Sequence, residues 1–286
     1  MRWKGNRQSD NVEDRRGQGG AAPRFGGRSI GIGTIVVALV GGWVLGINPL
    51  TLLGVLSGGS PVAVQQPASP PADDTMARFV STVLADTEDV WQTVFRQNGG
   101  AYQEPRLVLF RGATQTACGT GQSAMGPFYC PADQKVYIDL GFYQTLKEQL
   151  GAPGDFAQAY VIAHEVGHHV QHLLGISDQV DRRRGRVSQS EYNQLSVRLE
   201  LQADCLAGVW AHHAQNARQI LEQGDVEEAM NAAARIGDDA LQRAAGGAVV
   251  PDSFTHGTSA QRQRWFQRGL QRGDLQGCDT FSAQSL

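Results

Sequence analysis

The sequence contains one run of five residues that could perform metal-dependent chemistry, His164-Glu165-Val166-Gly167-His168. Two histidines four positions apart share one face of a helix, so both imidazoles can bind the same metal ion. The glutamate between them is placed to act on a water molecule beside that metal. This H-E-x-x-H pattern is typical of zinc hydrolases. We therefore predict zinc ligands at His164 and His168 and a general base at Glu165.

The residues around the motif predict the helix that this geometry needs. Apolar residues recur at spacings of three and four between Phe156 and Leu173, which is the pattern of one helix face. Asp155 with Gln158 resembles a capping box at the start, and Gly175 stands where helices commonly stop. The motif is thus expected in mid-helix. That context favours a metal site over the alternative, a histidine pair with only a structural role.

A catalytic zinc site needs a third protein ligand and an open position for water. The longer metzincin pattern would need glycine in place of Gln171 and histidine in place of Leu174, so it does not apply. His172 is excluded because it lies about 12 Å along the helix axis from His164, at 1.5 Å per residue. The third ligand must therefore come from another element.

A second predicted helix can supply this ligand. It opens at Ser188 with the S-x-x-E pattern of a capping box and continues as an apolar stripe. Glu200 and Asp204 lie beside the stripe, four residues apart and hence on one face. A carboxylate there is costly without a positive partner, so we predict Glu200 as a zinc ligand and Asp204 as an acceptor for a ligand imidazole. The alternative is an ion pair of Glu200 with Arg198 or an arginine of the 182–184 loop.

Three segments make the sequence resemble a known family. They are the HEVGHH run from His164, the SVRLELQADC run from Ser196 and the HGTSAQR run from His256. Over nearly the whole chain they resemble the bacterial, membrane-anchored neutral zinc metallopeptidases. At motif level they resemble the gluzincins, in which a glutamate from a later helix completes the zinc site. The resemblance implies a zincin-like fold and protease activity.

The reaction that these residues predict is hydrolysis of a peptide bond with one zinc ion and an activated water. A donor should face the oxyanion that develops. We predict His256 in this role, with Arg262 supporting it, because the segment resembles the histidine-then-arginine element of other membrane gluzincins. A capping histidine and a structural arginine are the alternative. Manganese or cobalt could replace zinc.

Two other classes of function remain open from the sequence. The first is a non-catalytic, zinc-stabilised binding protein, and the second is a scaffold that recruits membrane partners. A purely structural metal site is normally closed by a fourth protein ligand. Glu165, which is placed to act on a water molecule, argues against such a site here. The sequence has no phosphate-cradling glycine loop and no concentrated basic stripe, so nucleotide and nucleic-acid binding are not expected.

The first quarter of the chain predicts a membrane anchor. Residues 1–28 carry seven basic and three acidic side chains, and no charge follows from 29 to 72. We therefore predict a basic cytoplasmic tail at 1–28, one transmembrane helix at 29–56 and a Gly-, Ser- and Pro-rich linker at 57–73. A metallopeptidase domain at 74–286 follows. A cleaved signal peptide is the alternative.

The order of these segments predicts a topology in the bacterial inner membrane. By the positive-inside rule the N-terminus stays in the cytoplasm and the catalytic domain is exported to the periplasmic or extracellular side. Gly42 and Gly46 form a G-x-x-x-G pair that could join two spans as a homo-oligomer, although glycine is common in membrane helices. The expected partners are a peptide or protein substrate and the lipid bilayer.

Four cysteines on an exported domain predict two disulfides. Cys118 and Cys130 bracket a turn-rich loop that a bridge would hold, which leaves Cys205 for Cys278. Four cysteines allow three pairings, and a buried free Cys205 is the alternative.

The remaining pattern predicts an α+β domain in which helices predominate. A helix is expected over 74–96, short strands over 106–110 and 135–139, and helices from Phe142 onward, with breaks at Gly224 and Gly237. The alternating 135–139 strand precedes the zinc helix. We therefore expect it at a sheet edge, where an extended substrate could add to it. An ordinary sheet strand is the alternative.

Overall fold

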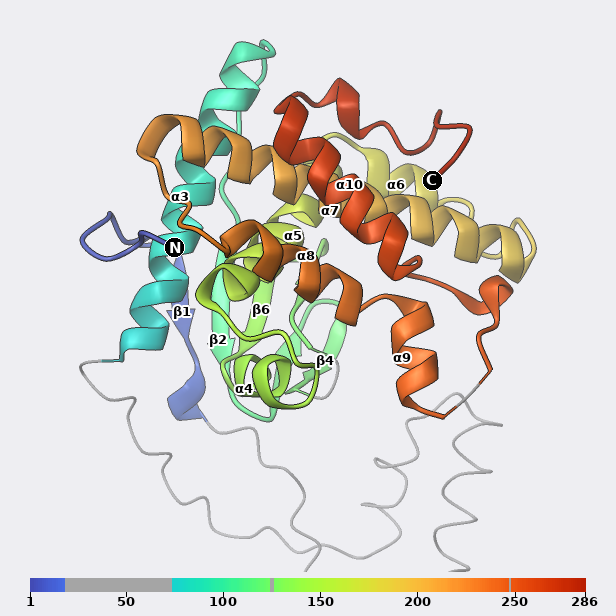
Figure 1. The fold of residues 1–286 in the computed structure, drawn as a ribbon, viewed down its shortest axis with the longest axis horizontal. Helices are drawn as coiled ribbons and strands as arrows, with labels where there is room; N and C mark the ends of the chain where they lie inside the picture. The colour runs from blue at the N-terminus through green and yellow to red at the C-terminus, as the bar shows by residue number, and fades with distance from the viewer. Residues whose placement is uncertain (19–73, 124–125, 247) are drawn as a thin grey trace, which may run out of the picture.

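The computed structural model describes residues 1–18, 74–123, 126–246 and 248–286, and in these the protein is α+β and mostly helical, as predicted (Figure 1). Its helices are α3 Thr75–Gln97, α4 Gly141–Glu148, α5 Asp155–Leu173, α6 Ile176–Asp181, α7 Gln189–Arg218, α8 Asp225–Arg235, α9 Asp238–Ala244 and α10 Ser259–Arg272. Its strands are β1 Val12–Asp14, β2 Arg106–Phe110, β3 Ala113–Thr116, β4 Gly119–Gln122, β5 Phe128–Cys130 and β6 Lys135–Asp139. The predicted helix breaks at Gly224 and Gly237 are confirmed, since α8 and α9 begin one residue after them.

The main sheet has four strands in the order β1-β2-β6-β5. β1, β2 and β6 run parallel, and β5 runs antiparallel to β6, while β3 and β4 form a separate antiparallel pair. The strands predicted at 106–110 and 135–139 are confirmed. The expectation that 135–139 lies at a sheet edge is wrong, because this strand hydrogen-bonds to β2 on one side and β5 on the other. The edge beside the zinc-motif helix is β5.

The zinc-motif helix α5 begins differently from the predicted capping box. Its N-cap is Gly154, at φ 123°, which has no side chain to cap the helix, so the pairing of Asp155 with Gln158 is wrong. Instead, the Glu228 carboxylate accepts a hydrogen bond from the Phe156 amide in the first turn, at 3.1 Å. A Cβ atom on Gly154 would collide with the carboxylate of Glu228, which explains a glycine there. At the other end Gly175 has φ 70°, which confirms the predicted stop. The capping box at the start of α7 is also confirmed.

Close packing of α5 against α7 and of α7 against α10 forms the centre of the molecule (Figure 1). Phe156 of α5 stacks on Trp210 of α7 with ring centroids 5.8 Å apart, and both are fully buried. Burying each such ring contributes roughly 1.5–3 kcal/mol. Gly167 makes the approach possible, because a Cβ there would lie 3.0 Å from the Ala203 carbonyl oxygen. Because Gly167 has no side chain, the H-E-x-x-H motif can pack directly against α7, the helix that carries Glu200.

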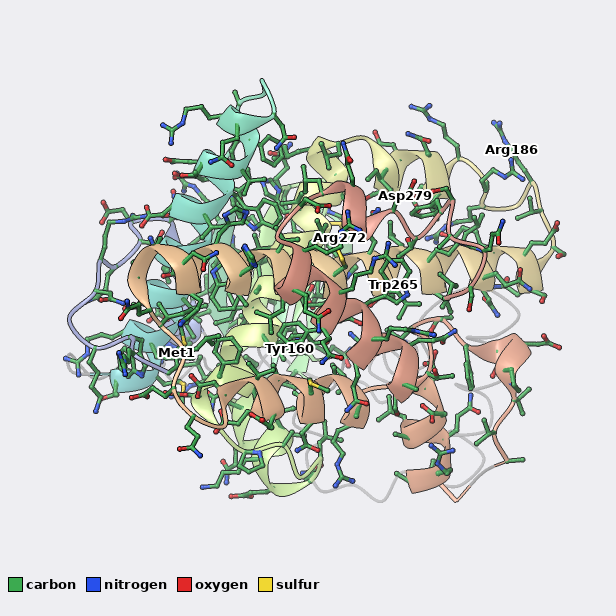
Figure 2. All side chains as sticks on the ribbon, turned by 45° about the horizontal axis from the view of Figure 1, so that its top comes forward. Met1, Tyr160, Arg186, Trp265, Arg272 and Asp279 are labelled. Carbon is green, nitrogen blue, oxygen red and sulfur yellow. A yellow bond between two sulfur atoms is a disulfide. The ribbon has the colours of Figure 1, made fainter. Side chains whose placement is uncertain are left out.

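Residues 1–18 belong to the same folded body as the rest. β1 pairs with β2 in register Val12 to Leu107, and the Ser9 amide donates to the Ser81 carbonyl oxygen at 3.1 Å. The prediction that 1–28 forms a separate tail is therefore wrong for residues 1–18, which β1 ties into the sheet. Figure 2 shows Met1 against the folded domain.

The predicted span at 29–56 and linker at 57–73 lie outside the described residues. Within the described ranges, none of the helices combines the length and the apolar character that a bilayer crossing requires.

Both predicted disulfides are confirmed. Cys118 is bonded to Cys130 and Cys205 to Cys278. The second bridge joins the middle of α7 to the C-terminal segment after α10. The alternative of a free Cys205 is thereby excluded.

Candidate metal centre

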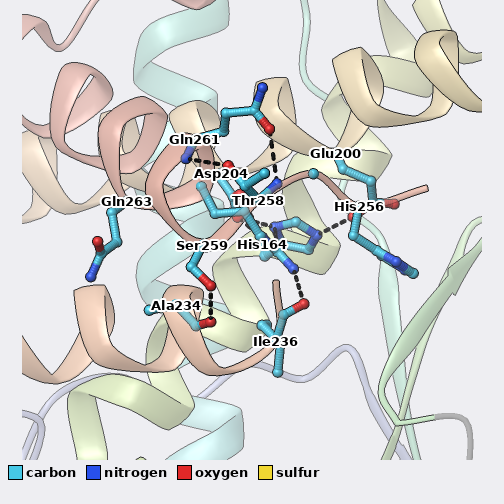
Figure 3. A network of polar contacts seen from close by, with 12 residues as sticks. His164, Glu200, Asp204, Ala234, Ile236, His256, Thr258, Ser259, Gln261 and Gln263 are labelled. Atoms are coloured by element: carbon cyan, nitrogen blue, oxygen red, sulfur yellow. Dashed lines mark hydrogen bonds and ion pairs between the residues drawn. The ribbon is translucent and has the colours of Figure 1, made fainter. Parts of the chain in front are cut away.

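Side chains from α5 and α7 converge on one point (Figure 3). The Nε2 atom of His164 lies 3.1 Å from Glu200 Oε2, and the Nε2 atom of His168 lies 3.5 Å from Glu200 Oε1. One ligand atom from each of the three residues lies within 4.8 Å of the other two. The structure therefore brings together the three residues predicted as metal ligands, two from α5 and one from α7, although Glu200 lies 32 positions after His168 in the sequence.

A buried ionic network supports His164. Asp204, which is fully buried, lies with Oδ1 2.8 Å from His164 Nδ1. The same carboxylate accepts hydrogen bonds from Tyr160 Oη at 2.5 Å and from Arg262 Nε and Nη2 at 2.8 and 2.9 Å. Because Nδ1 of His164 faces a carboxylate, its Nε2 faces the metal position. Asp204 thus lies where the sequence predicts it.

Arg262 also lies beside the site, where it supports Asp204. Its side chain is 2% exposed and binds Asp204, and it donates to the Ile236 carbonyl oxygen at 3.2 Å. The guanidinium is therefore engaged in holding Asp204 in place. The structure gives it this positioning contact rather than a direct one with His256.

The electric field of these groups alters their protonation. Burial by itself would lower the pKa of His164, but the charge of Asp204 and hydrogen bonds to Asp204 and Glu200 outweigh it and raise this pKa to about 10. Burial would raise the pKa of Asp204, yet the charges of Arg262 and His164 hold it at about 2. Both shifts favour a charged pair of His164 and Asp204, so binding of a metal at His164 should be accompanied by release of a proton.

The charge on Glu200 is explained by its histidine neighbours. Burial would raise the pKa of Glu200, but the charge of His168 and hydrogen bonds to both imidazoles hold it well below the usual range. The alternative of an arginine partner is not borne out among the described residues, because the ion pairs of Glu200 are with His164 and His168. Arg198 donates to the carbonyl oxygens of Thr280 and Ala283 instead. The positive partner that the Glu200 carboxylate needs must therefore lie on the side of the two histidines.

His256 lines the same cleft from the loop before α10. Its backbone amide donates to Asp238 Oδ2 at 2.6 Å, and its Nδ1 lies 3.1 Å from Asp238 Oδ1. This hydrogen bond to Asp238 raises the pKa of His256 above its usual value, although burial opposes it. The structure thus places His256 at the site with its Nε2 free of the Asp238 contact.

Sequence reasoning missed Tyr160 and Asp238. Tyr160 appears in the apolar stripe of α5, but its position one turn before His164 places its hydroxyl against Asp204, the carboxylate that contacts His164. Asp238 follows the glycine break before α9 and looks like an ordinary first-turn acid. Its contact with His256 depends on a loop 18 residues away, which no local pattern reveals.

The cluster opens into a cleft of about 890 Å³. His164, Glu165, His168 and Glu200 line one part of it, and His256 lines another. Much of the remaining wall is apolar and comes from β5, α4, the segment after α4, α5 and α9, as Phe128, Tyr129, Phe142, Leu150, Val161 and Leu241. An extended ligand can therefore reach the metal position from solvent.

The donor set fits a zinc ion. Two imidazole nitrogens and one carboxylate make up the common ligand set of catalytic zinc, and imidazole with carboxylate suits zinc better than calcium or magnesium. His164 has a carboxylate at its other ring nitrogen, which is the support that zinc-binding histidines usually have. His164, His168 and Glu200 would hold the ion, and the cleft leaves room for water.

Comparison with known proteins agrees with this geometry. A family model described as "Putative neutral zinc metallopeptidase" matches residues 1–281. The chain is 54% identical over 290 residues to the uncharacterized protein YpfJ of Escherichia coli strain K12, covering 98% of this chain and 99% of YpfJ. It is 42% identical over 221 residues to the uncharacterized protein Rv2575 of Mycobacterium tuberculosis, covering 73% of each. No solved structure matches. The chain belongs to this family of neutral zinc metallopeptidases.

Proposed function

We propose that the protein is a zinc-dependent endopeptidase with a zincin-like fold and a single zinc ion. The observation that carries this proposal is the convergence of His164, His168 and Glu200 within 4.8 Å at a cleft that Glu165 also lines. A metal with only a structural role would be enclosed by a fourth protein ligand. The open cleft and the adjacent carboxylate favour catalysis over the alternative of a binding or scaffold protein.

Zinc held by these three residues would polarise the scissile carbonyl and acidify a water molecule. Glu165 accepts the proton of that water and later delivers it to the leaving amine. Burial raises the pKa of Glu165, although the charges of both histidines oppose the shift. A raised pKa suits a general base, because it brings proton affinity closer to the operating pH.

The edge strand β5 is the proposed site for the substrate backbone. β5 lies at the end of the sheet and lines the cleft with Phe128 and Tyr129. Tyr129 is held by a contact of 2.9 Å between its hydroxyl and Nδ1 of the buried His169. An extended peptide could pair with this fixed edge through main-chain hydrogen bonds. The apolar wall favours substrates with apolar side chains near the scissile bond.

His256 is proposed to donate a hydrogen bond to the oxyanion. Replacing it with alanine is expected to lower kcat by about 10²- to 10³-fold, as loss of one oxyanion donor does. Zinc stoichiometry should be unchanged, because His256 is not among the three converging ligands. The matched control is His213→Ala, which removes a half-buried histidine that contacts the Gly273 carbonyl oxygen and the ring of His212. An unchanged kcat in His256→Ala, or an equal loss in the control, would remove this role.

The proposed function is tested by incubating the zinc-loaded full chain with casein and with a peptide library. Cleavage should stop when a chelator removes zinc and return when zinc is added back. The Glu165→Gln protein is the control for contaminating proteases. Stoichiometric zinc without cleavage of any peptide would favour the zinc-stabilised binding protein instead.

A further inference from the structure

His168 has no carboxylate behind it, in contrast to His164. Its Nδ1 lies 2.9 Å from Oε1 of Gln171, which is three residues further along α5 and fully buried. The Gln171 amide nitrogen donates to the Leu199 carbonyl oxygen at 2.7 Å and to Gln202 Oε1 at 3.0 Å. Gln202 in turn donates to the Cys278 carbonyl oxygen at 3.0 Å. Two buried side-chain amides therefore connect this histidine to main-chain carbonyl groups.

The donors and acceptors in this series of hydrogen bonds are fixed by the main-chain carbonyl groups at its far end. A carbonyl oxygen can only accept, so the amide nitrogens of Gln171 and Gln202 must face Leu199 and Cys278. The amide oxygen of Gln171 then necessarily faces His168. It can only accept a hydrogen bond, which requires the proton of the imidazole to reside on Nδ1. The Nε2 lone pair is thereby left pointing at Glu200, 3.5 Å away.

We propose that Gln171, oriented by Gln202 and the Leu199 carbonyl group, is the positioning residue that sets the tautomer and ring orientation of His168 for metal binding. Reversing the Gln171 amide would place its NH2 group against the His168 ring nitrogen and its oxygen against the oxygens of Leu199 and Gln202, where neither can donate. The disulfide between Cys205 and Cys278 holds the last acceptor of this series, the Cys278 carbonyl group, beside α7. This inference rests on the proposed zinc site but not on proteolysis.

The test measures zinc affinity of the full chain by competition with a chromophoric chelator. Gln171→Met, which has a similar shape but no acceptor, is expected to bind zinc about 10- to 100-fold more weakly, as loss of a supporting hydrogen bond typically causes. Gln171→Glu keeps an oxygen for the Nδ1 proton and should bind zinc more tightly than Gln171→Met. The matched control is Gln263→Met on α10, which loses one bond to the Met230 carbonyl oxygen, at 3.0 Å, away from the metal ligands.

Unchanged zinc affinity in Gln171→Met would overturn the inference, as would equal losses in the methionine and glutamate variants. Absence of zinc binding in the unaltered protein would instead refute the metal site itself. If Gln171→Met does not fold, nitrogen NMR of the zinc-loaded, unaltered protein decides. The inference requires a proton on Nδ1 of His168, and a proton on Nε2 would contradict it.

A second inference rests on the N-terminal segment. Glu88 of α3 is 1% exposed, and in the described chain its hydrogen-bond donors are Arg7, Ser9 and Asn11, at 2.9, 2.5 and 2.9 Å. Without these residues the carboxylate would be a buried charge with no partner. Together with the β1–β2 pairing, this makes residues 1–18 a required part of the domain.

The geometry points to one aqueous compartment for residues 1–18 and 74–286. A strand cannot hydrogen-bond to its neighbour across a bilayer, so the predicted arrangement, with the N-terminus inside and the catalytic domain outside, is incompatible with the pairing of β1 with β2. The two disulfides favour the oxidising side for both parts.

Cysteine labelling in intact bacterial cells tests this placement. Lys4 and Arg186 are both exposed, and Figure 2 shows Arg186 on an outer loop. Since the native cysteines are all paired, Lys4→Cys and Arg186→Cys each provide a single reactive thiol on the full chain. A membrane-impermeant maleimide should label both before lysis or both only after it. Labelling of one from outside and of the other only after lysis would overturn the inference.

Discussion

Replacing Glu165 with glutamine is expected to abolish measurable proteolysis while zinc remains bound. Glutamine has nearly the same shape, but its amide cannot accept a proton from water at neutral pH. A general base typically contributes on the order of 10²- to 10⁴-fold, so kcat/KM should fall by at least that much. His164, His168 and Glu200 are untouched, so the zinc content should not change.

The measurement pairs initial rates on a fluorogenic peptide with metal analysis of the same sample. Glu227→Gln is the matched control, because it removes an exposed carboxylate from the helix α8. Full activity of Glu165→Gln would exclude Glu165 from the mechanism. Loss of zinc together with activity would show that this residue supports the metal rather than the water.

The elements around the site could be predicted because their signals are local. The α5 helix follows from apolar spacing within 20 residues, and the start of α7 follows from the Ser188 capping box. Glu200 and Asp204 could be selected because acidic residues beside a buried stripe need a positive partner. These arguments need no knowledge of how the helices pack.

The wrong predictions concern β1 and the edge of the sheet, which are determined by contacts between residues far apart in the sequence. β1 is a three-residue strand containing two acidic residues, and its partner lies 95 positions along the chain, from Val12 to Leu107. Nothing in its pattern indicates a sheet strand. A basic segment before an apolar run is more commonly a cytoplasmic tail that precedes a transmembrane helix. The misplaced sheet edge has a similar cause, since strand order depends on which strands meet, not on alternation within 135–139.

The supporting residues were missed for a different reason. Tyr160 and Asp238 have ordinary local patterns, and their roles come from contacts with Asp204 and His256, which packing brings near. Gln171 is three residues from His168 on the same helix, but its amide is oriented by groups of α7, the Leu199 carbonyl oxygen and Gln202. Their common signal is a polar group on an otherwise buried face. Such a group must find a partner, so each polar residue one turn from a predicted ligand can be considered as its support.

Replacing Glu200 with alanine is expected to remove the metal itself. Its two carboxylate oxygens face the Nε2 atoms of both histidines at 3.1 and 3.5 Å, and no other described carboxylate belongs to that cluster. Loss of a supporting hydrogen bond alone weakens metal binding by about 10- to 100-fold. Loss of a ligand should exceed this, so zinc affinity should fall by more than about 100-fold.

The fold should survive this change, because Glu200 is only partly buried and alanine favours the helix. Circular dichroism of the metal-free proteins checks this, and Glu227→Ala controls for loss of a helical glutamate. The two largest effects then differ in kind, since Glu165→Gln should lose turnover with zinc retained, whereas Glu200→Ala should lose both. A Glu200→Ala protein that binds zinc with unchanged affinity would place the third ligand elsewhere. That result would refute the convergence of α5 and α7 as the metal site.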